Sequence, residues 1–283
     1  MKLFDRCARV IVHRQDPISL TERRDSFLSI TDLRMVFEIA KSVDKEPNTA
    51  TLTIDNCNAQ TRAELQQKPL TVQIEAGYGG VYRNLFVGNL LFGASTPAGT
   101  EWSTHLELVD GGRAYSRARI TRAYKVGTEL RTVLRDTAKS MGLDVPQALL
   151  DTSEFSSQVA AGVSVDGVSR DVLTRLLAPY GYTWSIQDGK LQVLRADQSL
   201  ANEAWLVNED NGLIGSPEYS APENGSRSRT LTFANLLYPE LTPGGKVQVE
   251  SRQINGLHRI KSVKHSGDTY GTEWTTEVEA TPL

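Results

Sequence analysis

The chain has 283 residues, and its 31 Lys and Arg against 34 Asp and Glu give a formal net charge of −3. This length suggests about two domains, and the absence of a basic excess argues against a dedicated DNA or RNA binder. The apolar runs are short, as at residues 90–92, and the first residues lack the apolar stretch of a signal peptide. We therefore expect that the protein folds in a cytoplasm and does not insert into a membrane. The two cysteines, Cys7 and Cys57, are not in a CxxC motif and are expected to be reduced and buried.

The first part of the chain, up to residue 117, is predicted to be mainly β. Apolar residues alternate or run together between Gly, Pro and Asn residues, a pattern typical of strands. Strands are expected at residues 34–39, 50–54, 70–75 and 85–92. Between the second and third, Thr61 and Glu64 form a capping-box pattern that predicts one short helix.

The middle part, residues 118–200, is predicted to be a small α/β module. Helical spacing follows a cap at Thr128 and ends at Gly142, and a second helix is expected from Ser169 to Gly181. Alternation around Asp188 and Gly189 then predicts a β-hairpin.

The last part, residues 201–283, returns to β after a polar stretch. Residues 208–229 have no periodicity and contain two prolines, so a loop is predicted there. Further strands are expected at residues 230–233, 246–250, 258–263 and 274–280.

An internal repeat connects the two β regions. Residues 99–104 (GTEWST) and 271–276 (GTEWTT) match at five of six positions, and residues 72–75 (VQIE) match 247–250 (VQVE). The chain is thus predicted to hold two copies of one β unit. Trp102 and Trp274 are expected either to anchor the cores of their own copies or to face a neighbour. A ring of three such chains presents six similar units, so a three-fold assembly imitates a six-fold one.

Patterns of catalytic or metal-binding residues are weak. His258 and His265 lie in no known metal-ligand spacing, and residues 162–167 do not have the spacing of a nucleophile elbow. Alternating glutamates, as in residues 273–279, are typical of a solvated strand face rather than a glycosidase pair. We expect no catalytic residue, no metal and no cofactor.

Two local motifs are candidates for contacts. Gly77, Gly79 and Gly80 predict a hairpin turn able to contact a neighbour, since no Lys-Ser/Thr follows them as in a phosphate loop. Arg117 and Arg119, within the basic run 113–122, are predicted to line one charged strand edge, with a phosphate site as the alternative.

The motifs resemble one family. The run 48–54, Asn56, Thr61-Arg62, residues 72–80 and residues 85–88 resemble the first β domain of bacteriophage tail and baseplate hub proteins. Residues 237–244, 247–251, 256–260, 265–268 and 271–276 are similar to the last hub domain. The group includes late control D-like proteins, Mu-like baseplate hubs and the hub part of type VI secretion spikes. Residues 143–168 and 200–229 match poorly.

The resemblance implies a mainly β fold: two tube-type β-barrel domains, residues 1–117 and 201–283, flank the α/β module. It implies a virion protein, made in the host cytoplasm, that forms a homotrimeric pseudo-six-fold ring with strand edges paired between subunits. Expected partners are the tail tube, tape-measure and spike or tip proteins, with DNA only passing through the lumen. Two alternatives stay open, a receptor- or carbohydrate-binding tail protein and a cell-wall hydrolase, although no hydrolase extension is present in this sequence.

Overall fold

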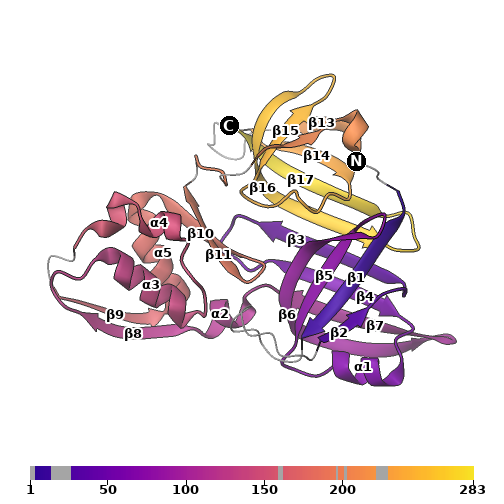
Figure 1. The fold of residues 1–283 in the computed structure, drawn as a ribbon, viewed down its shortest axis with the longest axis horizontal. Helices are drawn as coiled ribbons and strands as arrows, with labels where there is room; N and C mark the ends of the chain where they lie inside the picture. The colour runs from indigo at the N-terminus through magenta and orange to yellow at the C-terminus, as the bar shows by residue number, and fades with distance from the viewer. Residues whose placement is uncertain (1–3, 14–26, 159–161, 196, 201–202, 221–228) are drawn as a thin grey trace. The chain divides into compact units, whose positions relative to one another are not determined.

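The structure, a computed structural model, describes residues 4–13, 27–158, 162–195, 197–200, 203–220 and 229–283. The chain divides into two compact units (Figure 1). The larger contains Met1–Ser42, Asn48–Asp110 and Ser199–Leu283, and the smaller contains Val43–Pro47 and Gly111–Gln198. The two β regions, far apart in sequence, therefore share one compact unit. The division of that unit into two barrels stays a prediction.

The larger unit is built on one sheet of thirteen strands among the described residues. Its strands from the first half of the chain are β1 (Arg6–His13), β2 (Phe27–Ile30), β3 (Met35–Ser42), β4 (Thr49–Asp55), β5 (Thr71–Tyr78), β6 (Val81–Ala98) and β7 (Glu101–Val109). Those from the second half are β12 (Trp205–Val207), β13 (Leu213–Tyr219), β14 (Leu231–Leu236), β15 (Lys246–Glu250), β16 (Asn255–Asp268) and β17 (Trp274–Pro282). The order is β13-β14-β17-β16-β3-β4-β7-β6-β5-β1-β2, with β15 paired to β16 and β12 to β15. One helix, α1 (Ala59–Leu65), and a 3₁₀ turn (Glu209–Asn211) complete it.

The smaller unit is an α/β module, as predicted. Its elements are α2 (Gly112–Arg117), β8 (Arg119–Tyr124), α3 (Leu130–Ser140), α4 (Gln147–Leu150), β9 (Val163–Val168), α5 (Ser169–Leu177), β10 (Tyr182–Gln187) and β11 (Lys190–Arg195), with 3₁₀ turns at Ser153–Ser156 and Ala178–Tyr180. The strands form two separate pairs, β8 with β9 and β10 with β11. Asp188 and Gly189 turn the second hairpin with φ of 53° and 76°, as their sequence predicts.

Separate apolar cores support these elements. One cluster contains side chains of β1, β3, β4, β5, β6 and β7, and a second contains side chains of β14, β15, β16 and β17. In β3, buried and more exposed residues alternate along the strand, because successive side chains point to opposite faces. The module has its own clusters, which include Leu134, Leu173 and Trp184.

Two predicted helix starts are wrong in detail. Helix α1 begins at Ala59, because the Asn58 side chain accepts the hydrogen bond from the Thr61 backbone N–H at 2.8 Å. Thr61 is thus inside the helix and does not cap it. Helix α3 begins after Glu129, while the Thr128 hydroxyl donates to the Lys125 carbonyl instead. Both predicted stops hold: Gly142 and Gly181 have φ of 71° and 74°, the left-handed region that favours glycine.

The predicted loop at residues 208–229 is also wrong in part. Residues 213–219 form β13, which pairs antiparallel with β14. The register shifts between Ile214 and Glu218, so residues 215–217 form a bulge. Gly215 has a φ of 69°, and Pro217 donates no backbone hydrogen bond, which is why alternation is absent. Residues 221–228 of the predicted loop lie outside the described residues.

Candidate assembly interface

The predicted repeat is present in the topology of the sheet. We call β3 to β7 the N-terminal copy and β13 to β17 the C-terminal copy. The N-terminal copy has the order β5-β6-β7-β4-β3, and the C-terminal copy has the order β15-β16-β17-β14-β13. Every pairing in both is antiparallel, so the two copies have one topology.

The repeat extends to an irregularity of the backbone. Against β7, the register of β6 shifts between Leu90, opposite Leu108, and Phe92, opposite Glu107. Against β17, the register of β16 shifts between residues 260, opposite 280, and 262, opposite 279. The offset from residue 108 to 280 is 172, which is also the offset from Trp102 to Trp274. The same bulge thus occurs at the same place in both copies.

The two copies are joined by strand pairing that we call the internal junction. Residues 262–268 of β16 pair antiparallel with residues 36–42 of β3 (Figure 1). Two ion pairs connect its strands: Lys264 Nζ lies 3.0 Å from Glu38 Oε2, and, at one end, Arg34 Nη2 lies 2.8 Å from Asp268 Oδ2. The hydrogen bond from Arg34 is the main cause that lowers the pKa of Asp268 to about 2. The pair is therefore charged over the whole physiological pH range.

The internal junction also contains a buried histidine. His265 is buried, and its Nδ1 lies 2.9 Å from Thr276 Oγ1. Burial, and secondarily the positive charge of Lys41, lowers the pKa of His265 to about 3. The imidazole is therefore neutral at physiological pH and belongs to the core rather than to an exposed acid–base site.

The equivalent tryptophans have different surroundings. Trp274 is fully buried and packs edge-on against Phe37 of β3, with ring centroids 5.5 Å apart. It belongs to the core of the N-terminal copy, so the expectation that it anchors its own copy is wrong. Trp102 is 39% exposed and lies under the Arg62 guanidinium, 4.1 Å from its ring centroid. The strand that covers Trp274 belongs to the other copy, and no described residue covers Trp102 in that way.

The predicted glycine turn is confirmed for two of its three residues. Gly79 and Gly80, with φ of 58° and 75°, form the turn between β5 and β6. Gly77 instead lies within β5, where a Cβ atom would approach the Val81 carbonyl oxygen to 2.1 Å. A contact between this turn and a neighbour stays a prediction.

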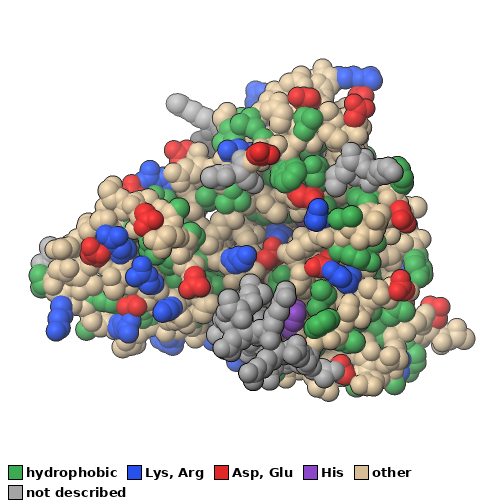
Figure 2. Space-filling model, viewed as in Figure 1, with side chains coloured by type: hydrophobic (Ala, Val, Ile, Leu, Met, Phe, Trp, Pro, Cys, Tyr) green, Lys and Arg blue, Asp and Glu red, His purple; other side chains and the backbone are tan. Residues whose placement is uncertain are grey.

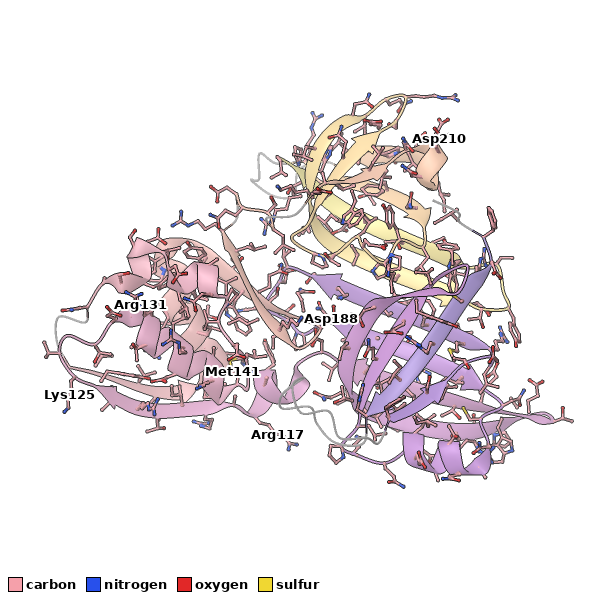
Figure 3. All side chains as sticks on the ribbon, in the orientation of Figure 1. Arg117, Lys125, Arg131, Met141, Asp188 and Asp210 are labelled. Atoms are coloured by element: carbon pink, nitrogen blue, oxygen red, sulfur yellow. The ribbon has the colours of Figure 1, made fainter. Side chains whose placement is uncertain are left out.

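The predicted strand over the basic run is wrong in its first half. Residues 112–117 form α2, and the strand β8 begins only at Arg119. Both Arg117 and Arg119 are exposed, and Figure 3 shows the Arg117 side chain directed away from α2. Basic side chains are spread over the visible face of the module in Figure 2. Arg117 and Arg119 are thus accessible, and their role at an interface stays a prediction.

The described residues offer few groups arranged for chemistry. No group of three or more His, Cys, Asp or Glu side chains within them could hold a metal ion. A shallow hollow of about 380 Å³ is lined by polar residues that include Asp32, Arg34 and Asp55. None of the helices in the described part of the chain has the length and apolar character needed to cross a membrane. The thirteen-stranded sheet leaves some strand edges unpaired among the described residues, and such edges can pair with another chain.

Comparison with known proteins gives matches in structure alone. No protein-family model matches the sequence, and no curated protein matches it. The fold is similar to that of a tail protein from Neisseria meningitidis MC58, with a TM-score of 0.65, 11% identity, and coverage of 99% of this chain and 97% of that one. It is also similar to the 43 kDa tail protein of prophage MuSo2 from Shewanella oneidensis, with a TM-score of 0.61, 10% identity and 96% coverage of both chains.

A third similar structure is the E. coli c3393 protein, with a TM-score of 0.60, 12% identity, and coverage of 89% of this chain and 74% of that one. That protein is described as a component of the type VI secretion system with structural similarity to the T4 bacteriophage tail proteins gp27 and gp5. The chain therefore has the fold of bacteriophage tail proteins and of a type VI secretion component, as the resemblance in its sequence predicts.

Proposed function

We propose that the chain is a structural subunit of a bacteriophage tail or baseplate hub and that it works by assembly, without catalysis. Three subunits form a ring whose six β copies imitate six-fold symmetry. The observation that carries this proposal is the repeat: two copies of one five-stranded order, joined by pairing between β3 and β16. A tail tube of six identical subunits could dock on such a ring, because each of its subunits would meet an equivalent copy.

The partners follow from this position in a tail. One face of the ring binds the tail tube or tape-measure protein, and the other binds a spike or tip protein. DNA passes through the lumen, and the net charge of −3 offers no general attraction for its phosphates. The protein is then part of the virion, after assembly in the host cytoplasm.

The alternative of a carbohydrate-binding tail protein has less support. Stacking on sugar rings needs exposed aromatic faces, and Trp274 is fully buried. Trp102 has its ring covered in part by Arg62. The proposal therefore places Trp102 and Trp274 in packing between β copies.

The solution mass of the purified protein tests this proposal. Light scattering is expected to give about 94 kDa, three times the subunit mass of 31.2 kDa, with a central hole in negative-stain images of the same fraction. A protein that stays at 31.2 kDa at every concentration up to the solubility limit contradicts a ring that closes without a partner.

A further inference from the structure

Several edges of the large sheet, including those of β2 and β12, have no strand partner on one side among the described residues. Two others are unpaired where the repeat has a paired equivalent. Residues 92–98 of β6 pair with β7 on one side only, because β5 ends its pairing at Asn89. Strand β13 is one of the two terminal strands of the sheet and pairs only with β14. Such edges present rows of backbone N–H and C=O groups that can pair with another chain.

Both edges have equivalents that are paired within the chain. Residues 92–98 of β6 correspond to residues 262–268 of β16, since both segments follow the repeated bulge. Strand β13 corresponds to β3, since each is the neighbour of the equivalent strands β14 and β4. Those equivalents, β16 and β3, pair with each other at the internal junction.

The unpaired segments are more exposed than their paired equivalents, as expected if a partner strand is absent from the single chain. His265, Ser266 and Gly267 are buried, whereas the equivalent residues 95–97 are half-buried or exposed. The unpaired edges also carry exposed apolar side chains: Phe92 is 48% exposed and Ile214 is 42% exposed. Trp102, next to residue 97 in the sheet, is exposed where Trp274 is covered by β3.

We infer that residues 92–98 of β6 pair antiparallel with β13 of a neighbouring copy of this chain, repeating the internal junction between subunits. This inference rests on the proposed ring and identifies the two edges that close it. Each subunit offers one edge of each kind, so the contact is heterologous and closes a ring when the rotation between subunits is 120°.

The internal junction also gives the register. Ser266 lies opposite Glu38, and the equivalent pair is Thr96 opposite Glu218 of the neighbouring copy. His265 lies opposite Ile39, and the equivalent pair is Ser95 opposite Tyr219 of the neighbouring copy. Thr96 and Glu218 thus face each other directly.

One position differs between the two junctions in a complementary way. At the internal junction, Gly267 lies opposite Phe37. A Cβ atom on residue 267 would lie only 2.4 Å from the Phe37 ring. The equivalent of Gly267 is Pro97, which has a side chain and no N–H. The equivalent of Phe37 is the bulge at residues 215–217, which has no large side chain. A glycine opposite a large ring is replaced by a proline opposite small residues.

Cysteine cross-linking tests the register. In the variant with both Thr96→Cys and Glu218→Cys, directly opposed residues have Cα atoms within the range that a disulfide spans. Mild oxidation with copper phenanthroline is expected to link most of the protein into trimers, seen on a non-reducing gel. The variant with Thr96→Cys and Ser220→Cys is the matched control, because its partners are two residues out of register; it is expected to link at least fivefold less.

The single variants Thr96→Cys and Glu218→Cys report any linkage through Cys7 or Cys57 and are expected to stay as single chains. If light scattering shows the ring and the matched pair links no better than the control pair, the edge assignment is wrong while the proposed function stands. If the wild-type chain is a monomer throughout and neither pair links, both the ring and this edge pairing are contradicted.

Discussion

Replacing Trp274 with alanine is expected to lower the free energy of unfolding by about 3–5 kcal/mol, the usual range for a fully buried large aromatic side chain. The ring is completely shielded from solvent and lies edge-on to Phe37, so the variant loses this contact and leaves a cavity between β17 and β3. Urea unfolding followed by circular dichroism, at a protein concentration where the chain is monomeric, measures the change.

The repeat supplies the matched control for this variant. Trp102→Ala removes the same side chain at the equivalent position, where the ring is 39% exposed and makes a cation–π contact with Arg62. Its expected cost is about 1 kcal/mol. Equal losses in the two variants would contradict the unequal surroundings of the two tryptophans.

Replacing Ser95 with proline is expected to prevent ring formation and leave the subunit folded. The Trp102 carbonyl accepts a hydrogen bond from the Asn56 backbone N–H, so the polar backbone groups of Trp102 point toward β4 and not toward β6. Pro97 lies opposite Trp102, and in an antiparallel pair its backbone groups, and those of Ser95 two residues before, therefore point away from β7. Proline at residue 95 therefore removes an N–H from the outer edge and none from within the subunit. Three lost hydrogen bonds per ring, at ~1 kcal/mol each, lower the trimerisation constant about a hundredfold. Because three subunits assemble together, the concentration needed for assembly then rises about tenfold, before the steric effect of the proline ring.

Ser95→Ala separates this effect from the loss of the hydroxyl. The Ser95 hydroxyl lies 3.0 Å from Thr104 Oγ1 and accepts a hydrogen bond from Gln66 Nε2 at 3.1 Å, and both variants lose these contacts. Light scattering over a dilution series is expected to show rings for Ser95→Ala at concentrations where Ser95→Pro is monomeric. Rings of equal stability in the two variants would show that this edge of β6 is not at the subunit interface.

Much of the fold could be predicted from local patterns. Alternating strands at β3, β4 and β14 are confirmed because each has one face against the core and the other toward solvent or polar side chains. The repeated hexamers also predicted that the chain contains two copies of one β unit, and the sheet contains both. This prediction required only self-similarity, which is independent of how the copies pack.

The features that could not be predicted from the sequence depend on which strands pair in the folded sheet. Strand β13 was predicted as loop because Gly215 and Pro217 interrupt its alternation, yet both are accommodated by a bulge at an open edge. Its correspondence to β3 could have been found by extending the repeat to residues 35–39. The burial of Trp274 by the other copy was not predictable from the hexamer, because the two hexamers are nearly identical while their neighbours in the sheet differ.

The rotational symmetry of the particle tests the central claim most directly, that each subunit contributes two equivalent β copies to one ring. End-on class averages from electron cryomicroscopy are expected to show one ring of six similar β densities. The whole particle should have only three-fold symmetry, because the module at Gly111–Gln198 occurs once per chain. Particles with two-fold symmetry, or with a ring of only three β densities, would contradict the account.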